Sequence, residues 1–223
     1  MWVIPPQANA AFVCAMEDIL TVYTRPVLSQ VPVICMDETS KQLTKESRIP
    51  LPGRRGQPRR YDYEYERNGV ANLFLFYAPF LGQRCVVVTD HRTKRDWAEQ
   101  IQALVDEWYP EAERIVLVLD NLNTHTGASL YETFAPAEAH RLLDRLEIHY
   151  TPKHGSWLNI AEIELSVLTR QCLGRRIPDK QTLAREVHAW AQKRNDCHAK
   201  VDWRFTSENA RIKLKRLYPI ISN

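Results

Sequence analysis

The sequence has no hydrophobic run long enough to cross a membrane. Its most apolar stretch, residues 70–81, is interrupted by Asn72 and Pro79, whereas a membrane-spanning helix needs about 18 or more consecutive apolar residues. The N-terminal residues also lack the charged start and the long apolar stretch of a signal peptide. We therefore exclude a membrane protein and expect a cytoplasmic one.

Closely spaced cysteines are missing as well. The five cysteines lie far apart along the chain, at positions 14, 35, 85, 172 and 197. They show no paired spacing of the kind that zinc sites have, and two of them fall within segments that predict strands. We therefore expect reduced, buried thiols and no zinc site.

An excess of charge of one sign is also missing. Lys and Arg number 30 against 27 Asp and Glu, which leaves a formal net charge of +3. A charge this small does not indicate a nucleic-acid partner by itself, so the distribution of the charge matters more.

Hydrophobic residues, by contrast, make up 44% of the 223 residues. That is enough to bury a substantial core, and it is typical of one domain with an appendage.

Two apolar segments each end on an aspartate, and this repetition is the most informative pattern in the sequence. Residues 33–36 precede Asp37, and residues 115–119 precede Asp120. A continuous apolar run predicts a strand covered on both faces, as in the middle of an α/β sheet. Two carboxylates from neighbouring strands, joined by a third from a helix, form a set of hard oxygen ligands suited to Mg²⁺.

We expect the third carboxylate on the helix that follows the next strand. Residues 146–150 alternate as a half-buried strand does, a proline and a glycine then break the chain, and a helix is predicted from Trp157 to about residue 173. Ser156 is the expected N-cap. Glu162 and Glu164 lie near the start of this helix but point roughly 200° apart, so at most one of them faces the aspartates. Periodicity alone does not choose between them.

Three blocks of sequence resemble the signature motifs of DDE transposases. They are residues 37–38, residues 120–125 (Asp-Asn-Leu-Asn-Thr-His) and residues 152–162, which end in the pattern Leu-Asn-x-x-Glu. The chain is most similar to the insertion-sequence branch of IS six-thirty type, which is related to the mariner elements. The pattern assigns the third acid to Glu162. Because residues 203–219 also resemble the end of these enzymes, the likeness covers nearly the whole chain.

The resemblance implies an α/β, RNase H-like fold, a mixed sheet flanked by helices. It also implies a metal-dependent enzyme that cuts transposon ends and joins them to target DNA at a TA dinucleotide. Asp37, Asp120 and Glu162 would hold two Mg²⁺ ions about 4 Å apart, with Asp37 shared between them and Mn²⁺ as a substitute. The expected assembly is a homodimer on DNA, in a bacterial-type cytoplasm beside the nucleoid.

The sequence departs from these relatives in two ways. They carry a helix-turn-helix region ahead of the catalytic part, whereas this sequence starts just upstream of that part, so we expect end recognition to depend on another segment or another chain. The spacing from Asp120 to Glu162, 162 − 120 = 42 positions, also exceeds that of mariner relatives. It predicts an insertion around Pro136.

Other acids compete for the same roles. Asp90 ends a further apolar segment, but Thr93-x-x-Asp96 follows as a loose capping box, so we favour a turn or capping role. Glu38 points to the opposite face of the strand from Asp37, which suggests a structural or supporting role. Three polar residues after Asp120 are candidates to support the site in the same way: Asn121, Asn123 and His125. His125 would orient a water or a phosphate, or brace the loop.

A basic segment rich in proline and glycine, residues 44–67, separates the first two strands. Within it, five arginines stand among the prolines and glycines of residues 48–61, where they cannot form a regular element, which predicts an extended loop. We expect Arg54, Arg55, Arg59 and Arg60 to follow a DNA backbone through charge and bidentate hydrogen bonds. The alternative is a solvated loop whose charge serves solubility.

Three residues ahead of Glu162 form a second basic and aromatic group. Beside a metal site, Lys153 and His154 would hold phosphates of the cleaved strand, and Trp157 would stack on an unpaired base. Core packing is an equally good interpretation of Trp157.

The remaining patterns predict the organisation of the chain. They indicate helices over residues 8–24 and 97–108, a strand over residues 70–78, and helices begun by Pro136, Asp179 and Ser207. We divide the chain into an N-terminal linker and helix (1–30), a catalytic domain (31–175) and a C-terminal helical extension (176–223).

Two other functions stay open. A catalytically silent DNA-binding or assembly remnant of a transposase would share the motifs without the chemistry. A phosphatase of the haloacid dehalogenase type would need an acid two residues after Asp37, where this sequence has Thr39. We favour the transposase.

Overall fold

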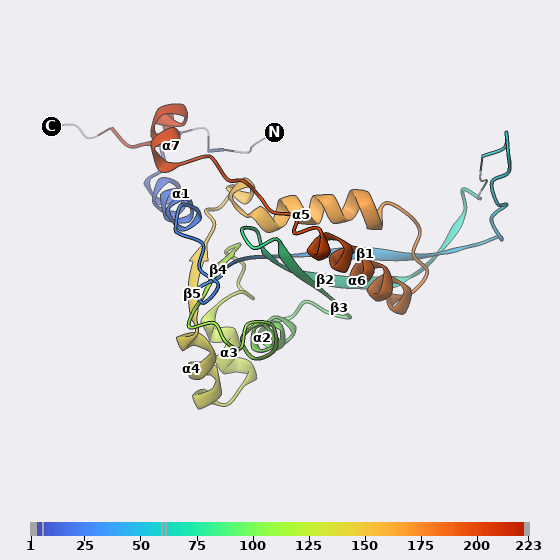
Figure 1. Cartoon of the computed structure of the whole chain (residues 1–223), viewed down its shortest axis with the longest axis horizontal. Helices are drawn as coiled ribbons and strands as arrows, with labels where there is room; N and C mark the ends of the chain where they lie inside the picture. Colours follow the sequence, from blue (N-terminus) through green and yellow to red (C-terminus); the bar gives the residue numbers. More distant parts are fainter. Residues whose placement is uncertain (1–3, 6, 59, 61, 221–223) are drawn as a thin grey trace.

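The computed structural model describes residues 4–5, 7–58, 60 and 62–220. At its centre lies a five-stranded mixed sheet with the order β3-β2-β1-β4-β5 (Figure 1). The antiparallel part comprises β1 (Val33–Glu46), β2 (Tyr65–Ala78) and β3 (Gln83–Thr89). The strands β4 (Ile115–Leu119) and β5 (Leu146–Tyr150) extend the sheet parallel to β1. The five predicted strands are therefore all present.

Helices cover both faces of this sheet, because its strands present apolar side chains to both sides. One face packs against α1 (Ala10–Tyr23), α5 (Ile160–Leu168) and α6 (Lys180–Asp196), and α7 (Ser207–Lys213) packs on α1. The other packs against α2 (Lys94–Ala103), α3 (Gly127–Thr133) and α4 (Pro136–Asp144). Neighbouring residues of β1 show the alternation, since Cys35 belongs to the first core and Ile34 and Met36 belong to the second.

Residues of the N-terminal and C-terminal segments share the first of these cores. Met16 of α1, Val187 of α6 and Ala210 of α7 are all part of it. The division of the chain into domains at residues 30 and 175 therefore stays a prediction.

The helix that carries Glu162 begins later than predicted, and its predicted end near residue 173 is reached through a π-helical turn. A 3₁₀ turn occupies Ser156–Leu158, and α5 begins only at Ile160. The N-cap is Asn159, whose side chain accepts a hydrogen bond from the amide of Ala161 at 3.1 Å, so the prediction of Ser156 was wrong. A π-helical turn, Thr169–Leu173, follows α5. The capping box between Thr93 and Asp96 at the start of α2 is confirmed.

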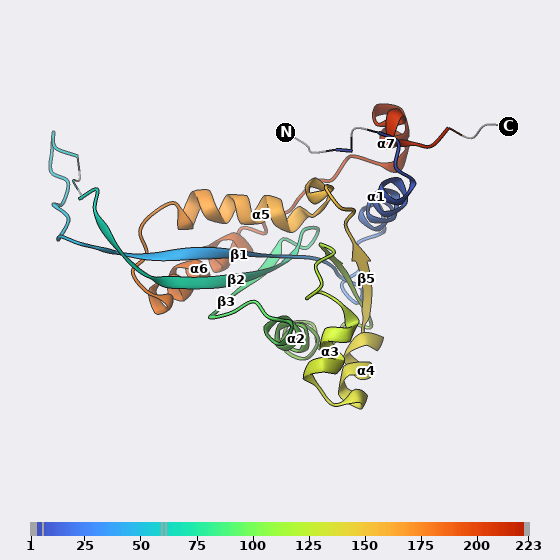
Figure 2. The same ribbon diagram turned by 180° about the vertical axis from the view of Figure 1, so that it is seen from behind.

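The strands β1 and β2 run on beyond the body of the protein as a long arm, which Figures 1 and 2 show projecting to one side. The described residues between Glu46 and Tyr65 close the arm, and backbone bridges pair Leu51 with Arg60 and Arg54 with Gln57. The predicted basic loop is therefore more regular than expected.

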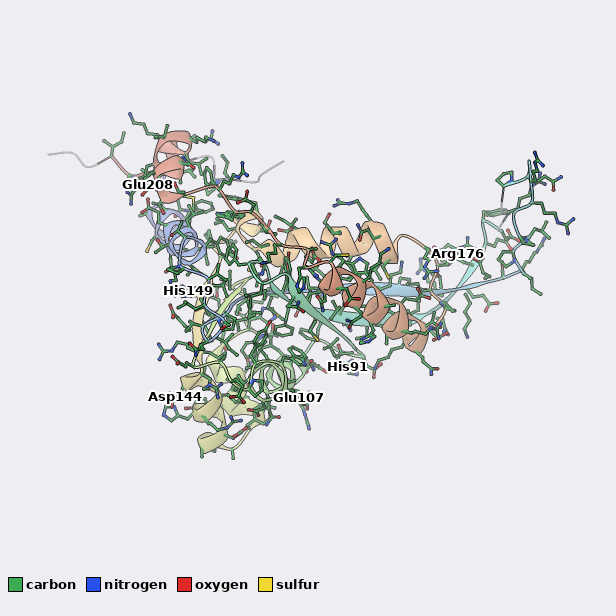
Figure 3. All side chains as sticks on the ribbon, viewed as in Figure 1. His91, Glu107, Asp144, His149, Arg176 and Glu208 are labelled. Atoms are coloured by element: carbon green, nitrogen blue, oxygen red, sulfur yellow. The ribbon has the colours of Figure 1, made fainter. Side chains whose placement is uncertain are left out.

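Arg176 fixes the root of the arm, near the point in Figure 3 where the hairpin leaves the body. It pairs with Glu46 and donates to the carbonyl oxygens of Glu64 and Tyr63 at 3.0 and 3.1 Å. The backbone adds a hydrogen bond from Thr44 to the carbonyl of Ile177 at 2.8 Å. The direction of the arm is thereby tied to the segment that follows α5.

All five cysteines are free thiols, and Cys35 and Cys172 are buried. Cys14 and Cys197 are exposed, so the prediction that the cysteines are buried was wrong for these two. Within the described ranges, no helix has the length and apolar character needed to span a membrane.

Candidate active site

The two aspartates lie at the same level on neighbouring strands. The parallel register pairs Cys35 of β1 with Val118 of β4, and Asp37 and Asp120 each follow two residues later. β4 ends at Leu119, whereas β1 continues past Asp37 to Glu46, so only Asp120 stands at a strand end. Because side chains alternate along a strand, both carboxylates lie on the face that α5 covers.

Two hydrogen bonds bring the start of α5 to the same point. The amide of the Asn159 side chain donates to the carbonyl oxygen of Met36 at 2.9 Å, directly before Asp37. The hydroxyl of Tyr23 donates to the carbonyl oxygen of Leu158 at 2.7 Å. These bonds place Glu162, in the first turn of α5, in the same cavity as the two aspartates.

The three predicted acids line a single cavity of about 630 Å³. Besides Asp37, Asp120 and Glu162, its walls include several polar residues of the neighbouring loops: Asn121, Thr151, Lys153, His154, Ser156 and Asn159. Lys153 and His154 are the basic side chains among the described residues of this wall. The cavity therefore combines a carboxylate floor with a basic rim.

Burial raises the pKa of Asp37 to about 7, and the negative charges of Asp120, Glu162 and Glu38 act in the same direction. The amide of Glu38, which donates to Asp37 Oδ1 at 2.7 Å, opposes this rise only in part. No Lys or Arg side chain within the described residues forms an ion pair with Asp37 or Glu162. The carboxylates thus crowd one another without a neutralising partner on this side of the sheet.

His125 supports Asp120 from behind. Its ring is fully buried, with Nδ1 2.6 Å from Asp120 Oδ1 and Nε2 3.0 Å from Glu38 Oε2. It also stacks on Trp97, with 5.9 Å between the ring centroids. Burial disfavours the charged ring, yet the hydrogen bonds to the two carboxylates prevail and raise the pKa of His125 to about 9. A charged imidazole at neutral pH donates to both acids.

The acids line one cavity but do not form a ready set of metal ligands. In the described part of the chain, no three His, Cys, Asp or Glu side chains are arranged so that they could hold a metal ion as they stand. Asp120 turns one oxygen to His125, and Asp37 turns one oxygen to the amide of Glu38. The donor chemistry nevertheless fits a hard divalent cation, because three carboxylates that repel one another surround one space.

The structure brings some of the remaining predicted residues to the cavity and not others. Asn121 lines it, Glu38 and His125 lie behind it, and Asn123 is exposed outside it. Trp157 is only 8% exposed and packs edge-on against Phe205, with ring centroids 5.9 Å apart. Core packing is therefore favoured over base stacking for this tryptophan.

The predicted basic residues of the arm lie away from the cavity. Arg54, Arg55 and Arg60 are exposed near the tip, and the fourth predicted contact, Arg59, lies outside the described residues. Asp90 is exposed and pairs with Lys180 at 2.7 Å, so it does not join the three acids.

Glu164 has a role that sequence reasoning missed. Its side chain is 4% exposed and forms ion pairs with Nε of Arg84 at 2.9 Å and Nε of Arg194 at 2.7 Å. Arg84 also reaches the carbonyl of Ala199 and the side chain of Asn195. The two glutamates of α5 therefore divide as their spacing requires, with Glu162 at the cavity and Glu164 in a buried ion cluster on the other side. Periodicity signalled this division but not the partners.

Comparison with known proteins gives two results. Residues 32–184 match the sequence model of the DDE superfamily endonucleases. No functionally characterised protein in a curated set matches the sequence.

Solved structures share the fold. The chain is similar to the Mos1 mariner paired-end complex with Mn at a TM-score of 0.52 and 16% identity, over 89% of this chain and 64% of that chain. It is similar to the Mos1 strand transfer complex at a TM-score of 0.52 and 14% identity, over 91% and 66% of the two chains. The chain thus spans about two thirds of the length of these structures. With the strand order β3-β2-β1-β4-β5, the likeness confirms the predicted RNase H-like fold.

Proposed function

Because the chain belongs to the DDE superfamily endonucleases, we propose that it is the catalytic part of a DNA transposase. It would cleave DNA at the ends of a mobile element and join those ends to target DNA. The observation that carries the proposal is the cavity that Asp37, Asp120 and Glu162 line together. These residues come from β1, from the end of β4 and from α5, which is the order of the three motifs along the chain.

The same three carboxylates would hold the divalent cations, which we propose to be two Mg²⁺ ions replaceable by Mn²⁺. Support comes from the donor set and from the unneutralised charge around Asp37. When bound, the cations would stabilise the charge that develops on a phosphate during its transfer between oxygens.

The surrounding residues would prepare the carboxylates for that task. His125, itself held by Glu38, holds one oxygen of Asp120 and so limits the rotation of its carboxylate. Asn159 fixes the first turn of α5 against β1 and so fixes the backbone that carries Glu162. The raised pKa of Asp37 means that a bound proton competes with a bound cation near neutral pH.

DNA would contact the protein in two places. Lys153 and His154 at the rim of the cavity would meet the cleaved strand, and the arginines of the arm, Arg59 included, would meet a phosphate backbone further away. The arm extends well beyond the sheet, which suits a contact across a homodimer assembled on DNA (Figure 2). A TA target, a bacterial cytoplasm and association with the nucleoid complete the proposal.

A nicking assay on supercoiled plasmid tests the proposed function. Wild-type protein with Mg²⁺ or Mn²⁺ should convert the plasmid to open circles, whereas Ca²⁺ should support binding without cleavage. Asp37→Asn, Asp120→Asn and Glu162→Gln should each abolish nicking while DNA binding persists. Asp90→Asn is the matched control, because it alters an aspartate after a strand that does not reach the cavity. Cleavage by Asp120→Asn at the wild-type rate would reject its role.

Metal binding separates the enzyme from the silent remnant. Titration with Mn²⁺, followed by electron paramagnetic resonance, should show binding to the wild-type protein and its loss in Asp120→Asn. A protein that binds DNA but neither binds Mn²⁺ nor cleaves the plasmid would favour the remnant.

A further inference from the structure

We infer that His154 contacts the DNA strand at the point of cleavage, and that the fold holds it there in a backbone conformation that costs stability. The inference rests on the proposed function, because it assigns a substrate contact to the same cavity. That function places both Lys153 and His154 at the rim of the cavity. The inference goes further by assigning the contact to the strained His154 and by identifying the conformational cost that accompanies it.

The backbone of His154 is unusual. Among the described residues, only His154 and His198 combine a side chain with a positive φ, at 65° and 46°. This left-handed region crowds the Cβ atom against the backbone, so residues other than glycine adopt it rarely, and asparagine, aspartate and histidine do so more than most.

The turn around His154 explains why the chain needs that conformation. The amide of Gly155 donates to the carbonyl oxygen of Pro152 at 2.8 Å, which closes a four-residue turn with Lys153 and His154 at its centre. A turn with positive φ at its third residue normally has glycine or asparagine there. This chain has histidine instead, so the position most in need of glycine lacks it.

The glycine of the turn serves a different purpose. A Cβ atom added at Gly155 would lie 2.5 Å from Pro152 Cγ and 3.0 Å from the Pro152 carbonyl oxygen. Gly155 is therefore required for space, and it does not relieve the conformation of His154. The two adjacent residues each meet a separate constraint of the same tight turn.

Within the described part of the protein, no side-chain hydrogen bond or ion pair offsets the conformational cost at His154. Its side chain is exposed, and among the described residues it forms no hydrogen bond and no ion pair. It does line the cavity of Asp37, Asp120 and Glu162. A strained residue without an internal partner, beside the acids of a candidate active site, is expected to bind something from outside.

The chemistry of the cavity identifies what is bound. Lys153 and His154 are the basic hydrogen-bond donors among the described residues of a wall that also carries three carboxylates. A DNA strand that approaches three carboxylates brings phosphate oxygens, which accept hydrogen bonds from imidazole and ammonium groups. His154 is therefore assigned to a phosphate of the cleaved strand.

Three variants test this inference. His154→Gly removes both the strain and the donor, and His154→Asn keeps a donor on a residue that tolerates positive φ. His198→Gly is the matched control, because it relieves the same kind of conformation at the end of α6, outside the cavity. Each is compared with the wild type by thermal unfolding in EDTA and by plasmid nicking in Mn²⁺ over a range of DNA concentrations.

We expect His154→Gly to unfold at the wild-type temperature or up to about 3 °C above it, because the relief of strain offsets the added freedom of glycine. Its maximal nicking rate should fall about tenfold or more, as expected for loss of a hydrogen bond to a charged group. His154→Asn should retain more of that rate. His198→Gly should nick plasmid at the wild-type rate.

The outcomes separate this inference from the proposed function. Wild-type nicking together with an equal maximal rate in His154→Gly would overturn the inference alone. A large loss of rate in His198→Gly would also overturn it, because the effect would then be general to the fold. Wild-type protein that binds DNA without nicking it would reject the proposed function, and with it any cleavage contact of His154.

Discussion

Replacing Asp37 by asparagine should stabilise the metal-free protein even though it removes a candidate metal ligand. The carboxylate is largely buried among Asp120, Glu162 and Glu38, and its pKa rises from 3.8 to about 7. A difference of about three pH units, at roughly 1.4 kcal/mol each, corresponds to about 4 kcal/mol. Because Asp37 is partly accessible to water, we expect a gain of about 2 to 4 kcal/mol above pH 7. Asparagine retains the oxygen that accepts the hydrogen bond from the amide of Glu38.

The sign follows from proton binding. Between about pH 4 and pH 7, Asp37 holds a proton in the folded protein but releases it in the unfolded chain, so the free energy of unfolding falls as pH rises. Above pH 7 both states have lost the proton, and the full penalty remains. Asp37→Asn should abolish this decline, and the two proteins should be closest in stability near pH 4.

Urea denaturation in EDTA, from pH 4 to pH 8, measures the effect. Mn²⁺ should then stabilise the wild type strongly and Asp37→Asn little, because binding to the folded state adds to its stability. Asp90→Asn should give no gain, since the ion pair with Lys180 lowers the pKa of Asp90. An Asp37→Asn protein that is less stable than the wild type at pH 8 in EDTA would refute the assignment of a buried Asp37 charge that nearby carboxylates repel.

Three further results are expected. Glu164→Gln should lower the free energy of unfolding by about 3 kcal/mol in urea titrations, because two arginines lose their buried partner, whereas Glu162→Gln should not lower it, because it removes a charge that repels Asp37. The double variant Arg54→Gln/Arg55→Gln should weaken DNA binding and reduce the slope of log affinity against log salt by about 1.8, which anisotropy measures. The stabilisation from His125, complete below pH 6.5, should be lost as pH rises through about 9, and His125→Gln should lack that loss in denaturation series.

The hydrophobic patterns were sufficient to predict that five strands are present. Residues 115–119 are apolar throughout, and β4 is buried on both faces between β1 and β5. The capping box at Thr93 was also readable, because its two side chains act within four residues of each other. Local signals of this kind need no knowledge of distant contacts.

Other features depended on contacts that sequence spacing does not encode. α5 begins at Ile160 because Asn159 binds both the helix start and the carbonyl of Met36, which lies far away in the sequence. The burial of Glu164 depends on arginines in β3 and α6. For the arm, the sequence indicated only a basic segment rich in proline and glycine. Its extended hairpin depends on the long pairing of β1 with β2.

The consecutive acids Asp37 and Glu38 show how one strand connects the two faces of the sheet. Strand alternation sends Asp37 to the cavity and Glu38 to the opposite side, where it meets His125. His125 in turn contacts Asp120, so a series of hydrogen-bonded charged side chains runs from Glu38 through His125 to a carboxylate of the cavity. Loss of the Glu38 charge must therefore weaken the hold on Asp120, although Glu38 itself does not line the cavity. The geometry of the acid cluster is consequently set in part by residues that a bound substrate would never touch.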